Sequence, residues 1–165
     1  MLEKKETSAI IEPSGALGIL ELELRDADGK VVKKDIFKNL ITNAGLAGWA
    51  KRLGGLGSVA AFTYIALGTG TTPAANTDTT LESEISTGGG ARKAATPTSI
   101  TISITDDTLQ LVAQFDFTSS FAVTEAGVLN ASSSGSLLSR RVFSAYNVTN
   151  GSSLTVTWKL QQTRV

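Results

Sequence analysis

Apolar and polar residues alternate along much of this chain, the pattern of strands that bury one face. Between Leu20 and Leu24, leucines alternate with glutamates, which is typical of a half-buried β-strand over residues 17–24. Asp26-Ala-Asp28-Gly29 follows and predicts a tight turn, because glycine accepts a positive φ. Apolar residues then return over 30–37, so this part of the sequence predicts a β-hairpin.

One segment has helical spacing instead. Its apolar residues recur at intervals of three and four: Leu46, Trp49, Ala50 and Leu53. This spacing predicts a short helix over residues 44–53, with Asn43 as its N-cap and Gly54-Gly55 at its end. We expect Trp49 to lie in the core, on the buried face of this helix.

The rest of the chain reads as further strands separated by turn residues. We expect strands over residues 62–67, 100–104, 109–117, 121–130, 137–145 and 154–160. Residues 80–85 form a short strand or a turn, and 86–98, with three consecutive glycines, form a flexible loop. Ile100, Ile102 and Ile104 alternate with polar residues and lead into an Asp106-Asp107 turn, which predicts a second hairpin. Regularly spaced strands of this kind predict a mainly β fold: an antiparallel sandwich, jelly-roll-like or barrel-like domain.

The N-terminal residues break the pattern. Residues 1–14 are charged and then mixed before the chain reaches Gly15, so we expect an arm over 1–14 and a single β-rich domain over 15–165. An arm of this length buries too little apolar surface alone to offset its ordering entropy. We therefore expect it to contact a neighbouring subunit through Ile10, Ile11 and Pro13.

The amino-acid composition limits the kinds of functional site that the chain can form. The 165 residues include no Cys and no His, and 15 basic residues balance 15 acidic ones. Thiolate metal sites and disulfides are therefore excluded, and the commonest general base is missing. Without a basic surplus we expect no nucleic-acid binding. A local basic patch at Lys33-Lys34 or Arg140-Arg141 is the alternative, but short basic pairs of this kind are usually solvated. We expect no enzymatic activity, no metal and no cofactor.

The chain also offers no pattern of membrane insertion. Its first ten residues lack the apolar core of a signal peptide. Its longest apolar-leaning run, Val59–Leu67, is much shorter than a bilayer span. We expect synthesis in the cytoplasm and no membrane partner.

Two loops resemble ligand-binding motifs only superficially. Gly68-Thr-Gly-Thr-Thr-Pro73 has Pro73 where a dinucleotide loop has its third glycine, and no amphipathic helix follows. The Asp26–Gly29 turn resembles the start of a calcium loop, but Phe37 stands where the bidentate glutamate belongs. A structural loop and a hairpin turn are the favoured interpretations.

The sequence also does not favour a glycosidase or a carbohydrate-binding module. Glycosidases need two carboxylates that flank a cleft. Adjacent aspartates at 106 and 107 in a turn point apart, and Glu82 and Glu84 form the other close pair. A carbohydrate-binding module would present aromatic side chains on one sheet face, yet only 6% of residues are aromatic and most occupy core-like positions.

Three stretches carry a resemblance to a known group of proteins. They are Asn39–Gly45; Tyr64–Pro73 with Asp78–Glu82; and Val123–Asn130 with Leu137-Leu138, Val142-Phe143 and Leu154–Trp158. In order and spacing, over about residues 17–160, they resemble small structural proteins of tailed bacteriophages. The residues that carry the motifs are Asn39, Gly45, Gly68, Gly70, Leu81, Glu125, Gly127 and Trp158.

The resemblance implies a component of the virion without a catalytic motif. Its leading form is a capsid decoration (cementing) protein, a homotrimer that binds the major capsid protein on the outer surface of the head. The alternative is a tail or tail-fibre component involved in host attachment. Within the motifs we expect Gly68 and Gly70 to allow a sharp exit from a strand at a positive φ. We expect Glu125 to accept backbone N–H groups in a turn, and Trp158 to add a large apolar surface to the last strand.

Overall fold

The computed structural model describes residues 14–164, which are mainly β with one short helix. The elements in chain order are β1 (Ser14–Arg25), β2 (Val31–Ile41), α1 (Asn43–Leu53), β3 (Tyr64–Gly68), β4 (Lys93–Ala94), β5 (Thr96–Ile100), β6 (Thr108–Asp116), β7 (Phe121–Leu129), β8 (Leu137–Val148) and β9 (Ser153–Arg164). The predicted mainly β, barrel-like architecture is confirmed. Ser14 already belongs to β1, and residues 1–13 lie outside the described part of the chain.

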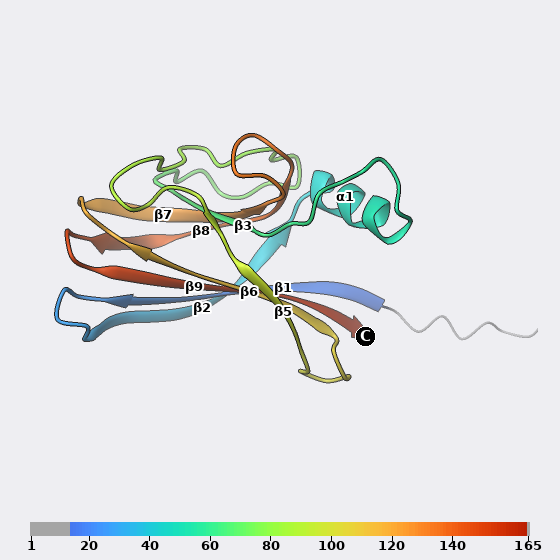
Figure 1. Ribbon diagram of the computed structural model, residues 1–165, viewed down its shortest axis with the longest axis horizontal. Coiled ribbons are helices and arrows are strands. Elements are labelled where there is room, and N and C mark those ends of the chain that lie inside the picture. The colour runs from blue at the N-terminus through green and yellow to red at the C-terminus, as the bar shows by residue number, and fades with distance from the viewer. Residues whose placement is uncertain (1–13, 165) are drawn as a thin grey trace, which may run out of the picture.

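The strands form one antiparallel sheet that nearly closes on itself (Figure 1). Its order is β4-β3-β7-β8-β2-β1-β9-β6-β5. The two ends of this order, β4 and β5, are separated in the chain by Ala95 alone. Since β4 pairs with β3 and β5 pairs with β6, a single segment joins both ends of the sheet into a barrel.

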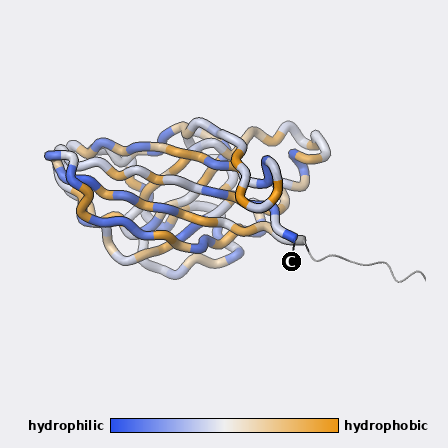
Figure 2. Tube along the Cα trace, turned by 90° about the horizontal axis from the view of Figure 1, so that it is seen from below, coloured by the Kyte–Doolittle hydropathy of each residue, from blue (hydrophilic) through white to orange (hydrophobic). Residues whose placement is uncertain are grey.

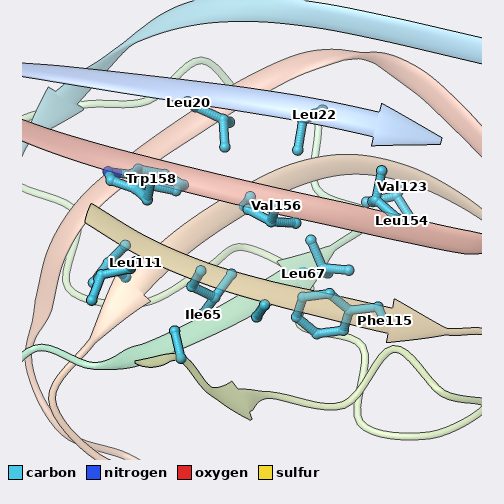
Figure 3. Packing of buried hydrophobic residues seen from close by; sticks show 14 of the residues in the cluster. Leu20, Leu22, Ile65, Leu67, Leu111, Phe115, Val123, Leu154, Val156 and Trp158 are labelled. Atoms are coloured by element: carbon cyan, nitrogen blue, oxygen red, sulfur yellow. The ribbon is translucent and has the colours of Figure 1, made fainter. Parts of the chain in front are cut away.

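Alternation along the strands places their apolar side chains inside the barrel. Leu20 and Leu22 of β1 are fully buried. Figure 3 shows them beside Trp158 and Val156, their partners on the neighbouring strand β9. Figure 2, a view from below, shows the same alternation as hydrophobic and hydrophilic residues that follow one another along the strands. The half-buried strand predicted over 17–24 is therefore confirmed, as is the burial of Trp158.

The strand predicted over 100–104 is wrong. β5 ends at Ile100, and Ile102 and Ile104 are 48% and 43% exposed in the loop that follows. The Asp107 carboxylate accepts hydrogen bonds from the backbone N–H groups of residues 102, 103 and 104, which holds them in a loop. The strand instead begins at Thr96, within the segment predicted to be a flexible loop. Pro97 is tolerated there because β5 pairs with β6 alone.

The helix differs from its prediction in its cap and in its buried face. Its N-cap is Thr42 rather than Asn43, because the Thr42 hydroxyl accepts from Gly45 N and donates to Leu137 O. The buried positions of α1 are Gly45 and Gly48. Its apolar side chains lie elsewhere: Leu53 is 81% exposed. Trp49 is half-buried and not part of the core, because the glycine face lies against the barrel in its place.

Candidate functional site

The motif around Glu125 forms a buried anchor for a long loop. Glu125 lies within β7, is fully buried, and accepts hydrogen bonds from the backbone nitrogens of Gly70 (3.1 Å), Glu82 (3.1 Å) and Ser83 (2.7 Å). The sequence predicted such bonds within a turn next to Glu125. They come instead from the two ends of the loop that follows β3, so Glu125 holds this loop against β7.

Arg140 on β8 completes the cluster. Its Nε donates to Glu125 Oε2 at 2.9 Å, and its Nη1 donates to Asp78 Oδ2 at 2.8 Å. Burial opposes charge on both partners of the second pair. However, their hydrogen bonds raise the pKa of Arg140 above its usual value, and the Ala75 N–H and Arg140 hold the pKa of Asp78 below its usual value. The prediction that Arg140 is solvated is wrong, and nothing local in the sequence indicates its burial.

The same loop is also tied to itself. Glu82 accepts hydrogen bonds from both the backbone nitrogen and the hydroxyl of Thr72, each at 2.8 Å. The backbone hydrogen bond from Thr72 is the leading cause of the lowered pKa of the Glu82 carboxyl. The carboxylates of Glu125 and Glu82 thus hold the two ends of the loop 70–83 together by hydrogen bonds, which gives the loop a defined shape.

The motif glycines allow close approach rather than unusual backbone angles. Neither Gly68 nor Gly70 has a positive φ, so that prediction is wrong. A Cβ on Gly68 would lie 2.3 Å from Glu125 Oε1, and one on Gly70 would lie 2.6 Å from the same atom. On β7, two residues beyond Glu125, a Cβ on Gly127 would lie 2.7 Å from Leu81 Cδ1. These three glycines make room for the Glu125 carboxylate and for the Leu81 side chain.

The remaining motif residues lie around the junction of β2, β8 and β9. The Asn39 amide is assigned so that all its neighbours are satisfied: its oxygen accepts from Trp158 Nε1 and Ile19 N, both at 3.0 Å, and its nitrogen donates to Ser139 Oγ. Gly45 packs nearby, where a Cβ would lie 2.2 Å from Leu138 O. The motifs therefore form two contact regions, one around Glu125 and one around Asn39.

The residues expected to contact a neighbouring subunit, Ile10, Ile11 and Pro13, lie outside the described residues.

A groove of about 600 Å³ opens between α1 and one end of the barrel. Most of its wall is apolar and includes the side chains of Trp49, Leu53, Phe62, Pro97, Leu109 and Leu160. The sequence did not predict this groove, because it placed the apolar face of the helix in the core. The volume is in the range of about 300–1,000 Å³ that is usual for small-molecule pockets.

Asp106 and Asp107 lie at the rim of the groove but have different roles. Asp107 is buried, which by itself would raise its pKa. Hydrogen bonds from the N–H groups of Ile104, Ile102 and Ser103 outweigh this effect and hold the pKa well below the usual 3.8. Asp106 is exposed and has a φ of 59°. Asp107 therefore organises the loop 101–107, and the two carboxylates do not act as a pair.

Within residues 14–164 no group of three or more acidic side chains is placed to hold a metal ion. No helix in that range combines the length and apolarity needed to cross a bilayer. Comparisons of the chain with protein-family models, curated proteins and solved structures find no match.

Proposed function

We propose that this chain is a non-enzymatic structural subunit of a bacteriophage virion, and specifically a capsid decoration protein. In this proposal it binds the outer surface of the head as a homotrimer after the shell has formed. The observation that carries the proposal is that the motif residues contact one another and hold loops in place. Glu125, one of the residues that carry the resemblance to phage structural proteins, accepts hydrogen bonds from Gly70, Glu82 and Ser83.

A polar network of this kind suits a protein that works by shape. Fully satisfied buried networks rigidify a fold and specify one arrangement of its loops. Here Glu125 and Arg140 link β7, β8 and the loop 70–83 in one cluster. A rigid barrel with defined loops can repeat the same contact at every equivalent position of a particle surface.

Binding to the assembled shell alone would stabilise it by mass action, because a ligand of one state shifts the equilibrium toward that state. Each contact can be weak. Several sites engaged by one trimer raise avidity by about 10²–10⁴-fold over single-site binding. A near-neutral chain, with 15 basic and 15 acidic residues, meets little self-repulsion when it forms such an oligomer.

The decisive experiment compares particles that carry the protein with particles assembled without it. We expect particles without it to release their genome at a lower temperature, and addition of purified protein to restore the higher temperature. Electron microscopy should place the protein on the head. Equal release temperatures would refute a cementing role. If its loss abolishes adsorption to cells and it is located on the tail, the tail or tail-fibre function replaces this proposal.

A further inference from the structure

Among the described residues, nothing covers an apolar groove at one end of the barrel. Leu53 on α1 and Leu109 on β6 both line it, and they are 81% and 36% exposed. Trp49 lines the same groove and is half-buried. Apolar side chains that are exposed singly need no explanation, but several that converge on one concave surface mark a contact site.

The chain enters the described fold beside this groove. The first described residue, Ser14, pairs with Arg164, and Gln162 of the same strand lines the groove. Figure 1 shows α1 and both ends of the described chain at the same end of the barrel. The thirteen residues before Ser14 are therefore attached at the end where the groove opens.

The direction of β1 favours a neighbouring molecule as the acceptor. β6 begins at Thr108, which pairs with Gln161, whereas β1 and β9 continue their own pairing to Arg164. β1 therefore projects about 10 Å beyond the start of β6, at about 3.3 Å per residue. Pro13 disfavours a helical turn at Glu12, which would be needed to reverse the chain at once toward its own groove.

The sequence of this segment contains a suitable anchor. Ile10 and Ile11 are adjacent apolar residues among charged and polar ones, only three residues before Ser14. Thirteen extended residues reach at most about 45 Å, which is enough to cross to an adjacent subunit. Two isoleucines also match an apolar groove better than a charged or purely polar segment would.

We infer that the groove between α1 and the barrel receives residues 2–13 of a neighbouring copy, with Ile10 and Ile11 against Trp49, Leu53 and Leu109. Each subunit then donates one arm and accepts one, a heterologous contact that closes into a ring. The inference deepens the proposed function, since it specifies how the subunits of the proposed homotrimer are joined.

Disulfide trapping tests this contact directly, because the chain has no cysteine of its own. Ile11→Cys chains and Leu53→Cys chains of different tagged mass are mixed, allowed to exchange and mildly oxidised. We expect a cross-linked pair that contains one chain of each kind. The matched control replaces Leu53→Cys by Val32→Cys, which is 52% exposed but lies beside the far end of β1, and should give little of this product.

Two results would overturn the inference. One is a yield with Leu53→Cys no higher than with Val32→Cys. The other is a double variant, Ile11→Cys with Leu53→Cys, that closes its disulfide within single chains only, which would place the arm in its own groove.

A second measurement does not depend on cysteine chemistry. The variant Ile10→Asp/Ile11→Asp should weaken self-association in sedimentation by about tenfold or more, with an unchanged far-UV spectrum. Unchanged association would contradict the inference. Both measurements use purified protein without virions, so their failure would leave the particle-stability test of the proposed function unaffected.

Discussion

At the scale of single residues, Glu125 is a fully buried carboxylate. A buried carboxylate is costly unless hydrogen bonds and an opposite charge compensate it. Glu125 has both, from three backbone N–H groups and from the Arg140 guanidinium. The glycines at 68 and 70 are part of the same arrangement, since any side chain there would displace the carboxylate.

Replacing Glu125 by alanine should destabilise the protein by about 3–5 kcal/mol, because it leaves a buried guanidinium and backbone N–H groups without their acceptor. Urea unfolding followed by tryptophan fluorescence measures the change. Asp28→Asn, at an exposed turn position, is the control and should stay within about 0.5 kcal/mol. A loss of less than about 1 kcal/mol for Glu125→Ala would show that the cluster contributes little to stability.

At the scale of elements, α1 lies against β8 through a glycine surface. Gly45 and Gly48 are its buried residues, and Gly48 accommodates the Phe62 ring, 2.6 Å from where a Cβ would be. Close backbone approach on this side leaves the helix's own leucines free. The groove is therefore a direct consequence of which face of α1 carries the small residues.

Gly45→Ala should force α1 away from Leu138, because the new methyl group would lie 2.2 Å from a backbone oxygen. We expect a loss of about 1–3 kcal/mol, as for other overpacked sites, measured by thermal or urea unfolding. Gly15→Ala is the matched control, since its methyl group would meet Thr163 Oγ1 at an ordinary 3.5 Å. Equal effects of the two substitutions would argue against this close packing.

The loop 101–107 is a second element whose shape depends on one carboxylate, and this makes it sensitive to acid. The folded state holds the pKa of Asp107 far below the usual 3.8 of the unfolded chain. A group of this kind stabilises the fold above its unfolded pKa, and the stabilisation is lost as pH falls through the folded value. The carboxylate therefore contributes to a decline in stability that begins below about pH 4.

Asp107→Asn removes this titration, so its free energy of unfolding should fall less steeply than that of the unaltered protein between about pH 4 and pH 2. Chemical unfolding at a series of pH values measures both slopes. Asp106→Asn, next to it but exposed, should keep the steep dependence, and asparagine tolerates the φ of 59° found there. Parallel slopes for Asp107→Asn and the unaltered protein would contradict the assignment.

At the scale of the whole molecule, the barrel has a seam with little backbone pairing between two long strands, β2 and β8. β2 and β8 pair only at Leu40 with Arg140 and Ile41 with Ser139. Beyond this point side chains bridge the two strands: the Tyr146 hydroxyl donates to Asp35 at 2.6 Å, and Lys33 Nζ donates to Ala145 O at 3.1 Å. Phe37 stacks on Phe143, with ring centroids 5.6 Å apart. The seam is therefore closed by side chains rather than by a ladder.

Tyr146 makes this seam sensitive to alkali. Burial, followed by the hydrogen bond to the Asp35 carboxylate, raises the pKa of the Tyr146 phenol above its usual 10.0. The folded state then retains a proton that the unfolded chain loses. Stability from this group is complete below about pH 10 and is lost as pH rises through the folded value.

Tyr146→Phe should cost about 1 kcal/mol at neutral pH, since one hydrogen bond is lost, and should flatten the decline in stability above about pH 10. Unfolding curves between neutral pH and about pH 11 test both effects. Tyr64→Phe is the control and should keep the alkaline slope. An unchanged slope in Tyr146→Phe would exclude the phenol as its source.

The sequence by itself determined the β-rich class, most strand positions and the burial of Trp158, because a period of two along a strand is a local property that every strand displays separately. It also placed the helix within one residue of its observed bounds. At Ile102 and Ile104 the alternation does not mark a strand. The Asp107 carboxylate, three to five residues away, accepts hydrogen bonds from their backbone nitrogens and holds them in a loop.

Only the tertiary structure decided how the motif residues meet. Glu125 reaches nitrogens that lie 42 to 55 residues away in the chain, and Asn39 contacts Trp158 on another strand. No local pattern encodes such contacts. The groove is a similar case, because α1 is amphipathic by sequence, and the close approach that its glycines permit decided that its apolar side chains would line a surface instead of filling the core.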